Sequence, residues 1–233
     1  MIDIHCHILP NIDDGASDED EALRMARIAV SDGIEAAIAT PHVMAPLPSQ
    51  EEIRSRVESL NALFTKHGVD FKVFPGAEVS YYSDLAYLDC YLLNDGPYLL
   101  LEFPHEYLPA TTAERISQFL RNDRKLILAH PERNKSIIMT PKMLLELVGP
   151  NVFVQVSAES VTGAFGPDVQ RCAMYLLKQG VVSFLATDAH SSRHRLPILS
   201  RAVKLASRVM GKDAAQRLVT SNPLQVINSD YAL

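Results

Sequence analysis

The sequence predicts an α/β protein built on parallel strands. Short apolar segments that suit strands alternate about seven times with segments of helical periodicity, a pattern typical of parallel sheets. The 233 residues contain no linker-like gap and no detectable repeat, so we expect one domain over residues 1–233. An open doubly wound sheet and a closed (β/α) barrel both fit this alternation.

Seven segments have the composition of strands. Valine recurs at every second position of residues 152–156, and residues 98–102 are continuously apolar until Glu102, which is typical of a buried strand. We expect strands at residues 1–5, 34–40, 71–73, 98–102, 126–129, 152–156 and 181–186.

Helices are expected between these strands, where apolar residues recur at helical spacing. Ser17 with Asp20, and Ser49 with Glu52, resemble capping boxes at helix starts. Thr140 is expected to cap another helix, with a proline in its first position. The expected helices cover residues 17–33, 49–68, 113–122, 140 onward, 167–179, 197–210 and 213–220, with a short helix within 84–91, a loop at 157–166 and a terminal turn from 223.

The composition disfavours nucleic-acid and membrane partners. The formal net charge of -6, from 22 basic and 28 acidic residues, argues against a nucleic-acid backbone as the main partner. No apolar run approaches the roughly 18 residues of a transmembrane helix, so we expect no stable membrane insertion. The N-terminus lacks a basic region followed by an apolar core, so no signal peptide is expected.

The three cysteines, Cys6, Cys90 and Cys172, are odd in number and far apart, which favours reduced thiols in a cytoplasmic protein. None is followed six residues later by Arg, the spacing of a cysteine-based phosphatase loop. No Gly-x-Gly-x-x-Gly follows the first strand, and no glycine-rich loop ends in Lys-Ser/Thr, which disfavours nucleotide binding.

Potential metal ligands follow, or lie at, the ends of the expected strands. His5 and His7, two residues apart, would point the same way from the first strand. In a (β/α) barrel the carboxyl ends of the strands share one face, where active sites lie. Histidines satisfied within the core would explain one pair, but a random scatter would not follow the strand ends so closely. The sequence therefore predicts a polynuclear metal site made of His5, His7, Asp14, His42, Glu78, Glu102, His130, Asp188 and His190.

These ligand types suit two or three divalent ions. Carboxylates can bridge ions, and a mixture rich in histidine suits Mn, Fe or Zn better than Ca or Mg. Paired ions about 3.5–4 Å apart generate a hydroxide nucleophile near neutral pH and stabilise an in-line phosphoryl transfer.

Two arginines indicate a phosphate-bearing substrate. Arg133 follows His130 by three residues and Arg195 follows His190 by five, so both could reach the metal face. The guanidinium fork matches a phosphate group bidentately. Ordinary surface salt bridges are the alternative explanation, and Arg193 competes with Arg195 for the same role.

The motifs together resemble the PHP (polymerase and histidinol phosphatase) superfamily. Within it, the chain is similar to the bacterial manganese-dependent protein-tyrosine phosphatases of capsular and exopolysaccharide operons. The likeness spans nearly the whole chain, and its combination of motifs is specific although Asp-x-His-x-His alone is not. The matching stretches are Asp3-Ile-His-Cys-His7, Ile12-Asp-Asp-Gly15, Thr40-Pro-His42, Gly76-Ala-Glu78, Glu102-Phe103, Ala129-His-Pro-Glu-Arg133, Thr187-Asp-Ala-His190 and Asn222-Pro223.

This resemblance implies a distorted, TIM-like (β/α)7 barrel of the PHP fold that holds three divalent ions, Mn²⁺ first and Fe or Zn as alternatives. It implies that His5, His7, Glu78 and Asp188 hold one ion, that Glu78, Glu102 and His130 hold a second, and that Asp14, His42 and His190 hold a third. Arg133 and Arg195 would clamp the phosphate.

The implied reaction is hydrolysis of a phosphotyrosine monoester in the tail of a cognate tyrosine autokinase that controls capsule or exopolysaccharide synthesis. A hydroxide held by the metals would attack phosphorus in line, and Asp14, His42 or a metal-bound water would protonate the leaving phenolate. One departure from the family pattern is Asn11, where relatives often have Gly, and Asn tolerates a positive φ better than most residues. A second departure is the loop from Thr40 to Glu51, which lacks the basic residues of some members.

Three alternatives remain at this stage. Histidinol phosphatase has the same chemistry on a small amine-bearing substrate, and other PHP phosphoesterases, such as exonucleases, cleave diesters. A non-catalytic, metal-bound regulator could instead only bind a phosphoprotein. The sequence leaves open whether the chain forms a homo-oligomer.

Overall fold

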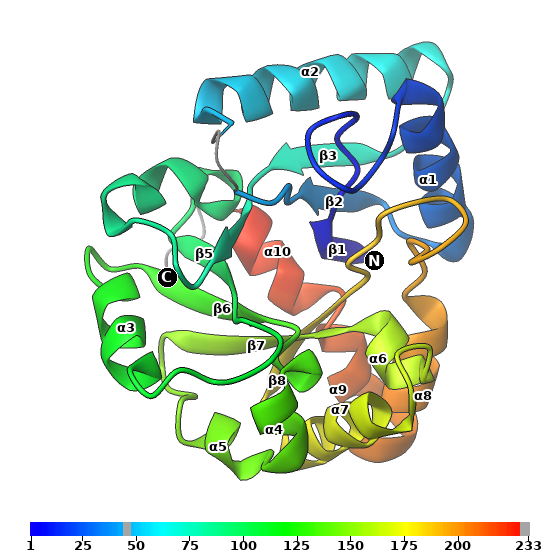
Figure 1. The fold of residues 1–233 in the computed structure, drawn as a ribbon. Helices are drawn as coiled ribbons and strands as arrows, with labels where there is room; N and C mark the ends of the chain where they lie inside the picture. The colour runs from blue at the N-terminus through cyan, green and yellow to red at the C-terminus, as the bar shows by residue number, and fades with distance from the viewer. Residues whose placement is uncertain (44–47, 229–233) are drawn as a thin grey trace.

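All strands of the protein run parallel and fall into two sheets. In a computed structural model, which describes residues 1–43 and 48–228, one sheet has the order β1-β2-β3 and the other β4-β5-β6-β7-β8 (Figure 1). The strands are β1 (Ile2–Cys6), β2 (Ala36–Ala39), β3 (Lys72–Pro75), β4 (Glu78–Ser80), β5 (Tyr98–Glu102), β6 (Lys125–Ala129), β7 (Val152–Ser157) and β8 (Val182–Ala186).

The two sheets meet on both sides and make a ring. Cys6, the last residue of β1, bridges Ala189 beyond the end of β8. Beyond the end of β2, His42 bridges Glu78, and both bridges are parallel. Strands β3 and β4 are separated by two residues and occupy consecutive parts of the same position in the ring, between β2 and β5. The ring therefore has seven positions, as expected for a distorted (β/α)7 barrel.

A glycine permits the break between β3 and β4. A Cβ atom on Gly76 would lie 2.7 Å from Cγ2 of Ile38 and 2.8 Å from Cδ2 of Leu93. Real side chains do not approach so closely, so only glycine lets the chain pass here and present Glu78 two residues later.

Helices surround the ring, and α10 lies next to β1 (Figure 1). The helices are α1 (Glu19–Asp32), α2 (Gln50–Lys66), α3 (Thr112–Phe119), α4 (Lys135–Met139), α5 (Lys142–Leu145), α6 (Ala158–Thr162), α7 (Pro167–Gln179), α8 (Ser200–Met210), α9 (Lys212–Arg217) and α10 (Ser221–Ile227), with 3-10 turns η1 (Leu85–Tyr91), η2 (Leu93–Asp95) and η3 (Pro131–Arg133).

Several local expectations were wrong. Asp18, not Ser17, caps α1, because its carboxylate accepts a hydrogen bond from the Glu21 backbone at 2.7 Å. Thr140 ends α4 instead of capping α5. The expected loop at 157–166 contains α6, and neither β4 nor α4 was expected. These short elements have too few residues to show a periodicity.

The hydrophobic core has two parts. The larger one packs the strands against the surrounding helices. The smaller one joins Ile4 of β1, Ile38 of β2 and Leu100 of β5 to Val226 and Ile227 of α10. Residues from strands that are not neighbours meet in this second cluster, so it fills the inside of the ring and α10 closes one end of it.

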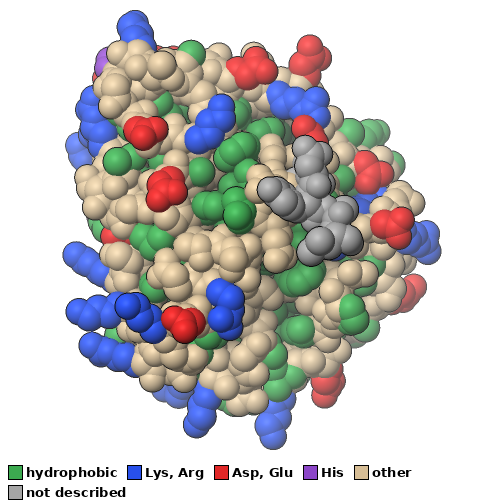
Figure 2. All heavy atoms as spheres, turned by 180° about the vertical axis from the view of Figure 1, so that it is seen from behind, with side chains coloured by type: hydrophobic (Ala, Val, Ile, Leu, Met, Phe, Trp, Pro, Cys, Tyr) green, Lys and Arg blue, Asp and Glu red, His purple; other side chains and the backbone are tan. Residues whose placement is uncertain are grey.

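The surface is mixed in charge. On the face opposite to that of Figure 1, basic and acidic side chains both project, and apolar side chains gather towards the middle (Figure 2). Within residues 1–43 and 48–228, no helix combines the length and apolar character needed to cross a lipid bilayer.

Candidate metal centre

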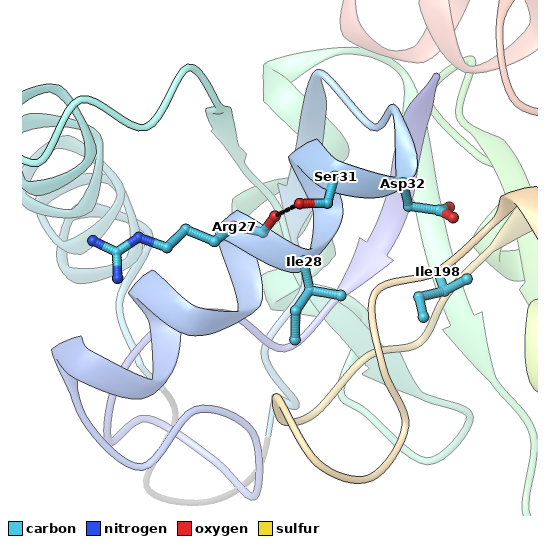
Figure 3. Close-up of a pocket in the computed structure, with 5 residues that line it drawn as sticks. All are labelled: Arg27, Ile28, Ser31, Asp32 and Ile198. Atoms are coloured by element: carbon cyan, nitrogen blue, oxygen red, sulfur yellow. Dashed lines mark hydrogen bonds between the residues drawn. The ribbon is translucent and has the colours of Figure 1, made fainter.

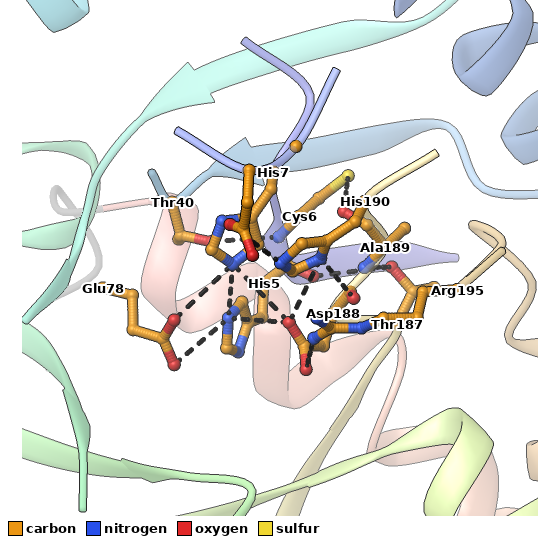
Figure 4. A network of polar contacts seen from close by, with 12 residues as sticks. His5, Cys6, His7, Thr40, Glu78, Thr187, Asp188, Ala189, His190 and Arg195 are labelled. Atoms are coloured by element: carbon orange, nitrogen blue, oxygen red, sulfur yellow. Dashed lines mark hydrogen bonds and ion pairs between the residues drawn. The ribbon is translucent and has the colours of Figure 1, made fainter. Parts of the chain in front are cut away.

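The structure brings all nine expected ligands to one end of the strands. Each of them belongs to at least one group of three or four residues whose potential ligand atoms lie within 4.8 Å of one another. Figure 4 shows His5, His7, Glu78, Asp188 and His190 of this set. The groups are His7-Asp14-His42-His190, His5-His130-Asp188, His5-His7-Glu78 and His42-Glu78-Glu102.

His5 of β1 and His7, which follows the strand directly, converge as expected. Their Nε2 atoms lie 3.2 Å apart. The Nδ1 atom of His5 lies 3.0 Å from Oε1 of Gln155, and that of His7 lies 2.7 Å from Oδ2 of Asp13. Both partners are acceptors, so each ring donates from Nδ1 and, when neutral, presents a lone pair at Nε2. Two facing lone pairs need a cation between them, either a proton on one ring or a metal ion bound by both.

Glu78 lies at the middle of the cluster. Its Oε1 atom is 2.9 Å from Nε2 of His130 and 3.4 Å from Nε2 of His5, and its Oε2 atom is 3.0 Å from Nδ1 of His42. Only 1% of its side chain is exposed. A carboxylate with neighbours on both oxygens can bridge two ions, which is the role that the family resemblance implies for Glu78.

The expected third set also lies together. Oδ1 of Asp14 is 3.4 Å from Nε2 of His190 and 3.6 Å from Nε2 of His42. Asp14 is 66% exposed, whereas Glu78 is almost fully buried, so this set forms the open side of the cluster.

The grouping differs in detail from the expected sets. His130 shares a group with His5 and Asp188, although the carboxylate oxygen nearest to its Nε2 atom is Oε1 of Glu78, at 2.9 Å. Glu102 shares a group with Glu78 and His42. His130 still lies 3.8 Å from Oε1 of Glu102. The sets therefore share residues, and the structure does not divide the nine side chains into three separate sites.

Both predicted arginines reach the cluster through one carboxylate. Nη1 of Arg133 donates to Oδ2 of Asp188 at 2.6 Å, and Nη2 of Arg195 pairs with the same oxygen (Figure 4 shows Arg195). Arg193, the rival for this role, is exposed. The geometry therefore favours Arg195 over Arg193.

Three residues of the cluster and its arginines have a left-handed backbone conformation. The φ angles of His130, Asp188 and Arg195 are 30°, 54° and 53°. A left-handed conformation costs a residue with a Cβ atom about 1–2 kcal/mol, and such strain persists where the surrounding structure enforces it. Asn11 also has a positive φ of 54°, which asparagine tolerates.

The carboxylates favour positive charge at the centre. Burial lowers the pKa of His7, but hydrogen bonds with Asp13 and Glu78 outweigh it and raise that pKa to about 10. Burial raises the pKa of Glu78, yet the charge of His5 and the hydrogen bond with His130 hold it well below its usual range. His190 differs, because burial and the charge of His7 lower its pKa to about 4. A neutral imidazole of this kind is a metal ligand.

The residues present fit bound metal ions. Among the described residues, Oδ1 of Asp188 and Nε2 of His190 are buried without a hydrogen-bond partner. Buried polar atoms without partners are costly, and each of these is a donor atom for a divalent ion. Together with the facing Nε2 atoms of His5 and His7, they indicate positions that a cation would satisfy.

Two supporting residues were missed from the sequence. Asp13 holds His7 and also accepts from the backbone of Gly15 at 3.0 Å and of His42 at 3.0 Å. Gln155 accepts from the backbone of His130 at 3.2 Å as well as from His5. The available signal for Gln155 was a polar residue between the valines of a strand. For Asp13 and Asp14, which are adjacent, the sequence does not indicate which side chain points towards His7.

A separate surface hollow has no link to the cluster. It measures about 320 Å³ and is lined by Arg27, Ile28, Ser31, Asp32 and Ile198 (Figure 3). Asp32 accepts hydrogen bonds from the backbone of Leu199 at 2.7 Å and of Ser200 at 2.9 Å, at the start of α8. The Asp32 carboxylate thus stabilises the start of α8.

Comparisons with known proteins agree on one family. The sequence model described as "Capsular polysaccharide synthesis, CpsB/CapC" matches residues 1–228. The chain is 33% identical to tyrosine-protein phosphatase YwqE of Bacillus subtilis, over 98% of this chain and 92% of that protein. It is 30% identical to the putative tyrosine-protein phosphatase CapC of Staphylococcus aureus, over 84% and 79%. It is 25% identical to tyrosine-protein phosphatase CpsB of Streptococcus pneumoniae, over 97% and 98%.

Solved structures give the same result. The fold matches the crystal structure of YwqE, described with CpsB as a unique metal-dependent tyrosine phosphatase, with a TM-score of 0.92, 33% identity and coverage of 98% of this chain and 95% of that one. A dihydroorotase-like domain of Chaetomium thermophilum matches with a TM-score of 0.59 and 12% identity, over 97% of this chain and 78% of that one, which is a likeness of fold alone.

Gly15 tests how closely the first loop packs on His7. A Cβ atom at this position would lie 2.1 Å from the carbonyl oxygen of His7 and 2.6 Å from its Cβ. We expect Gly15→Ala to destabilise the fold by about 2 kcal/mol or more, measured by urea unfolding, because the loop must move. Gly149→Ala is the control, since nothing lies within 4 Å of its added Cβ. Equal stability of the two variants would contradict this packing.

A variant of Asp13 tests whether its contact with His7 contributes to metal binding. We expect Asp13→Asn to weaken Mn²⁺ binding about tenfold to a hundredfold, because it removes the carboxylate that orients the His7 ring. Calorimetric titration with Mn²⁺ measures the effect, and Asp70→Asn, at an exposed position, is the matched control. Unchanged affinity in a folded Asp13→Asn variant would show that His7 does not depend on this contact.

Proposed function

The chain belongs to the CpsB/CapC family of capsular polysaccharide synthesis, and on this basis we propose that it is a metal-dependent protein-tyrosine phosphatase, a phosphoric monoester hydrolase. Its relatives YwqE and CpsB are named tyrosine-protein phosphatases at 25–33% identity over nearly the whole chain. The nine clustered side chains supply the ligand types that such an enzyme requires.

One observation carries the proposal for the site. Two guanidinium groups, from Arg133 and Arg195, meet the cluster at Asp188. Fixed positive forks beside a set of metal-ligand atoms are suited to a phosphate group, whose oxygens can contact both at once.

The protein residues have separate tasks in the proposed reaction. His5, His7, Asp14, His42, Glu78, Glu102, His130, Asp188 and His190 would hold the metal ions. When bound, the ions supply charge for the phosphate oxygens and lower the pKa of water so that it can act as the nucleophile. Arg133 and Arg195 orient the phosphate, so that phosphorus faces the cluster and the phenolate leaves towards solvent.

The leaving phenolate requires a proton from the open side of the site. Asp14 is 66% exposed and His42 is 23% exposed, and Nε2 of His42 lies 3.6 Å from Oδ1 of Asp14. Both side chains therefore face the open side of the cluster. We propose Asp14 and His42 as the candidates for proton transfer, with a bound water as the alternative.

We further propose three Mn²⁺ ions and a phosphotyrosine substrate in the tail of a cognate tyrosine autokinase. The overlapping ligand groups support more than one ion. The capsular context of the family supports a substrate in polysaccharide assembly. The three cysteines are free thiols, which supports work in the reducing cytoplasm. Residues 44–47, part of the loop between Thr40 and Glu51, lie outside the described residues.

Metal removal tests the proposed chemistry. We expect EDTA to abolish hydrolysis of p-nitrophenyl phosphate, because the nucleophile needs the ions, and added Mn²⁺ to restore it. A phosphotyrosine peptide should be hydrolysed with a higher kcat/KM than histidinol phosphate. Activity that survives full chelation would contradict the proposal. A higher kcat/KM for histidinol phosphate than for the phosphotyrosine peptide would identify a small phosphate ester, and not phosphotyrosine, as the substrate.

The two neighbouring arginines form a matched pair of variants. We expect Arg195→Ala to lower kcat/KM for the phosphotyrosine peptide about tenfold to a hundredfold, the effect of losing a charge-assisted contact. Arg193→Ala, at the exposed position, should change it less than twofold. Steady-state kinetics with Mn²⁺ measures both, and the reverse order would assign the phosphate contact to Arg193.

A further inference from the structure

Arg133 lies between a carboxylate and an aromatic ring. Its guanidinium carbon is 4.8 Å from the ring centroid of Phe165, within the range of a cation–π contact. Its Nη1 atom donates to Asp188 at 2.6 Å. The side chain of Arg133 is 18% exposed, so the ring and the carboxylate together hold it in one place at the edge of the cluster.

The loop that carries Phe165 has a fixed shape. It joins α6 to α7, and both of its glycines have left-handed backbones, with φ of 90° at Gly163 and 93° at Gly166. The amide of Gln170 in α7 donates to the carbonyl of Val161 at 3.0 Å. The same amide packs so closely on Gly163 that an added Cβ would lie 3.1 Å from it. Several independent features therefore determine where the loop presents Phe165.

The loop with Phe165 belongs to the segment that follows β7, so it lies at the end of the barrel where the cluster is. The ends of β1, β2, β5, β6 and β8, and the start of β4, each supply one or more of the nine clustered residues, but the segment after β7 supplies none of them. The segment after β7 instead carries Phe165, whose phenyl group contacts Arg133 at the same end of the barrel.

We propose that Phe165 is a positioning residue that holds the Arg133 guanidinium in the orientation for phosphate binding. This rests on the proposed function, in which Arg133 contacts the phosphate. An arginine side chain has several rotatable bonds, and the ring limits them while it shields the planar face of the guanidinium from water. Nη1 is bonded to Asp188, whereas Nε and Nη2 have no hydrogen-bond partner among the described residues and can donate to phosphate oxygens. Phe165 acts through Arg133 and not on the substrate itself.

The first test compares Phe165→Leu with Phe165→Tyr in the Mn²⁺-loaded protein. We expect Phe165→Leu to raise KM for p-nitrophenyl phosphate and Ki for inorganic phosphate by the same factor, about threefold to tenfold, with kcat changed less than twofold. Phe165→Tyr, which keeps the ring, should restore both constants to near the unmodified values. Tyr87→Leu, at an exposed aromatic residue of η1, is the control and should leave them unchanged.

The second test uses the coupling to Arg133. In an Arg133→Ala background, we expect Phe165→Leu to change Ki for phosphate less than twofold, since its effect passes through the missing guanidinium. If Phe165→Leu raised Ki for phosphate by the same factor with Arg133 present and with Arg133→Ala, the proposal would be overturned. A rise in KM for p-nitrophenyl phosphate with unchanged Ki for inorganic phosphate would also overturn it, because Phe165 would then contact the substrate ring.

A spectroscopic measurement separates this inference from the proposed function. In the metal-free protein, the Nε–H proton of Arg133 should show an upfield ring-current shift that Phe165→Leu abolishes and Phe165→Tyr retains. Absence of that shift would overturn the contact between the two residues. If the shift is present while the unmodified protein hydrolyses no phosphate ester with any metal, the proposed function fails and the arginine contact stands.

Discussion

The structure depends on two buried carboxylates that must be met by positive charge. The side chains of Glu78 and Asp188 are each 1% exposed, and removing carboxylates from water is costly unless they are paired. Imidazoles from several strands surround them, and two guanidiniums share one oxygen of Asp188. The polar end of the ring thus gathers acceptors and cations from distant parts of the sequence, and a divalent ion is the natural completion of this arrangement.

The cluster and the closure of the ring are one structural feature. The two sheets join where His42 bridges Glu78 and where Cys6 bridges Ala189, next to Asp188. The backbone of Asp188 donates to the carbonyl of His5 at 2.8 Å, and Asp3 accepts from the backbone of Thr187 at 3.0 Å. Changes that loosen these contacts will therefore alter the fold and the site together.

The sequence contained the alternation of strands and helices and all nine side chains that meet at the strand ends, because both follow from local pattern and chain order. It did not contain the distinction between Asp13, which points at His7, and Asp14, which faces the open side. It also did not indicate Gln155 under His5 or Phe165 on Arg133. Those contacts join residues that are distant in the sequence or depend on the path of a tight loop. The short helix α6 was missed for a similar reason, since five residues show no periodicity.

We propose that these nine side chains together bind several metal ions. Anomalous diffraction from crystals grown with Mn²⁺, collected on both sides of the manganese absorption edge, tests it most directly. We expect three manganese peaks per chain, with Glu78 shared between two of them and every one of the nine side chains in contact with at least one. A single peak, or manganese bound away from Glu78 and Asp188, would contradict it.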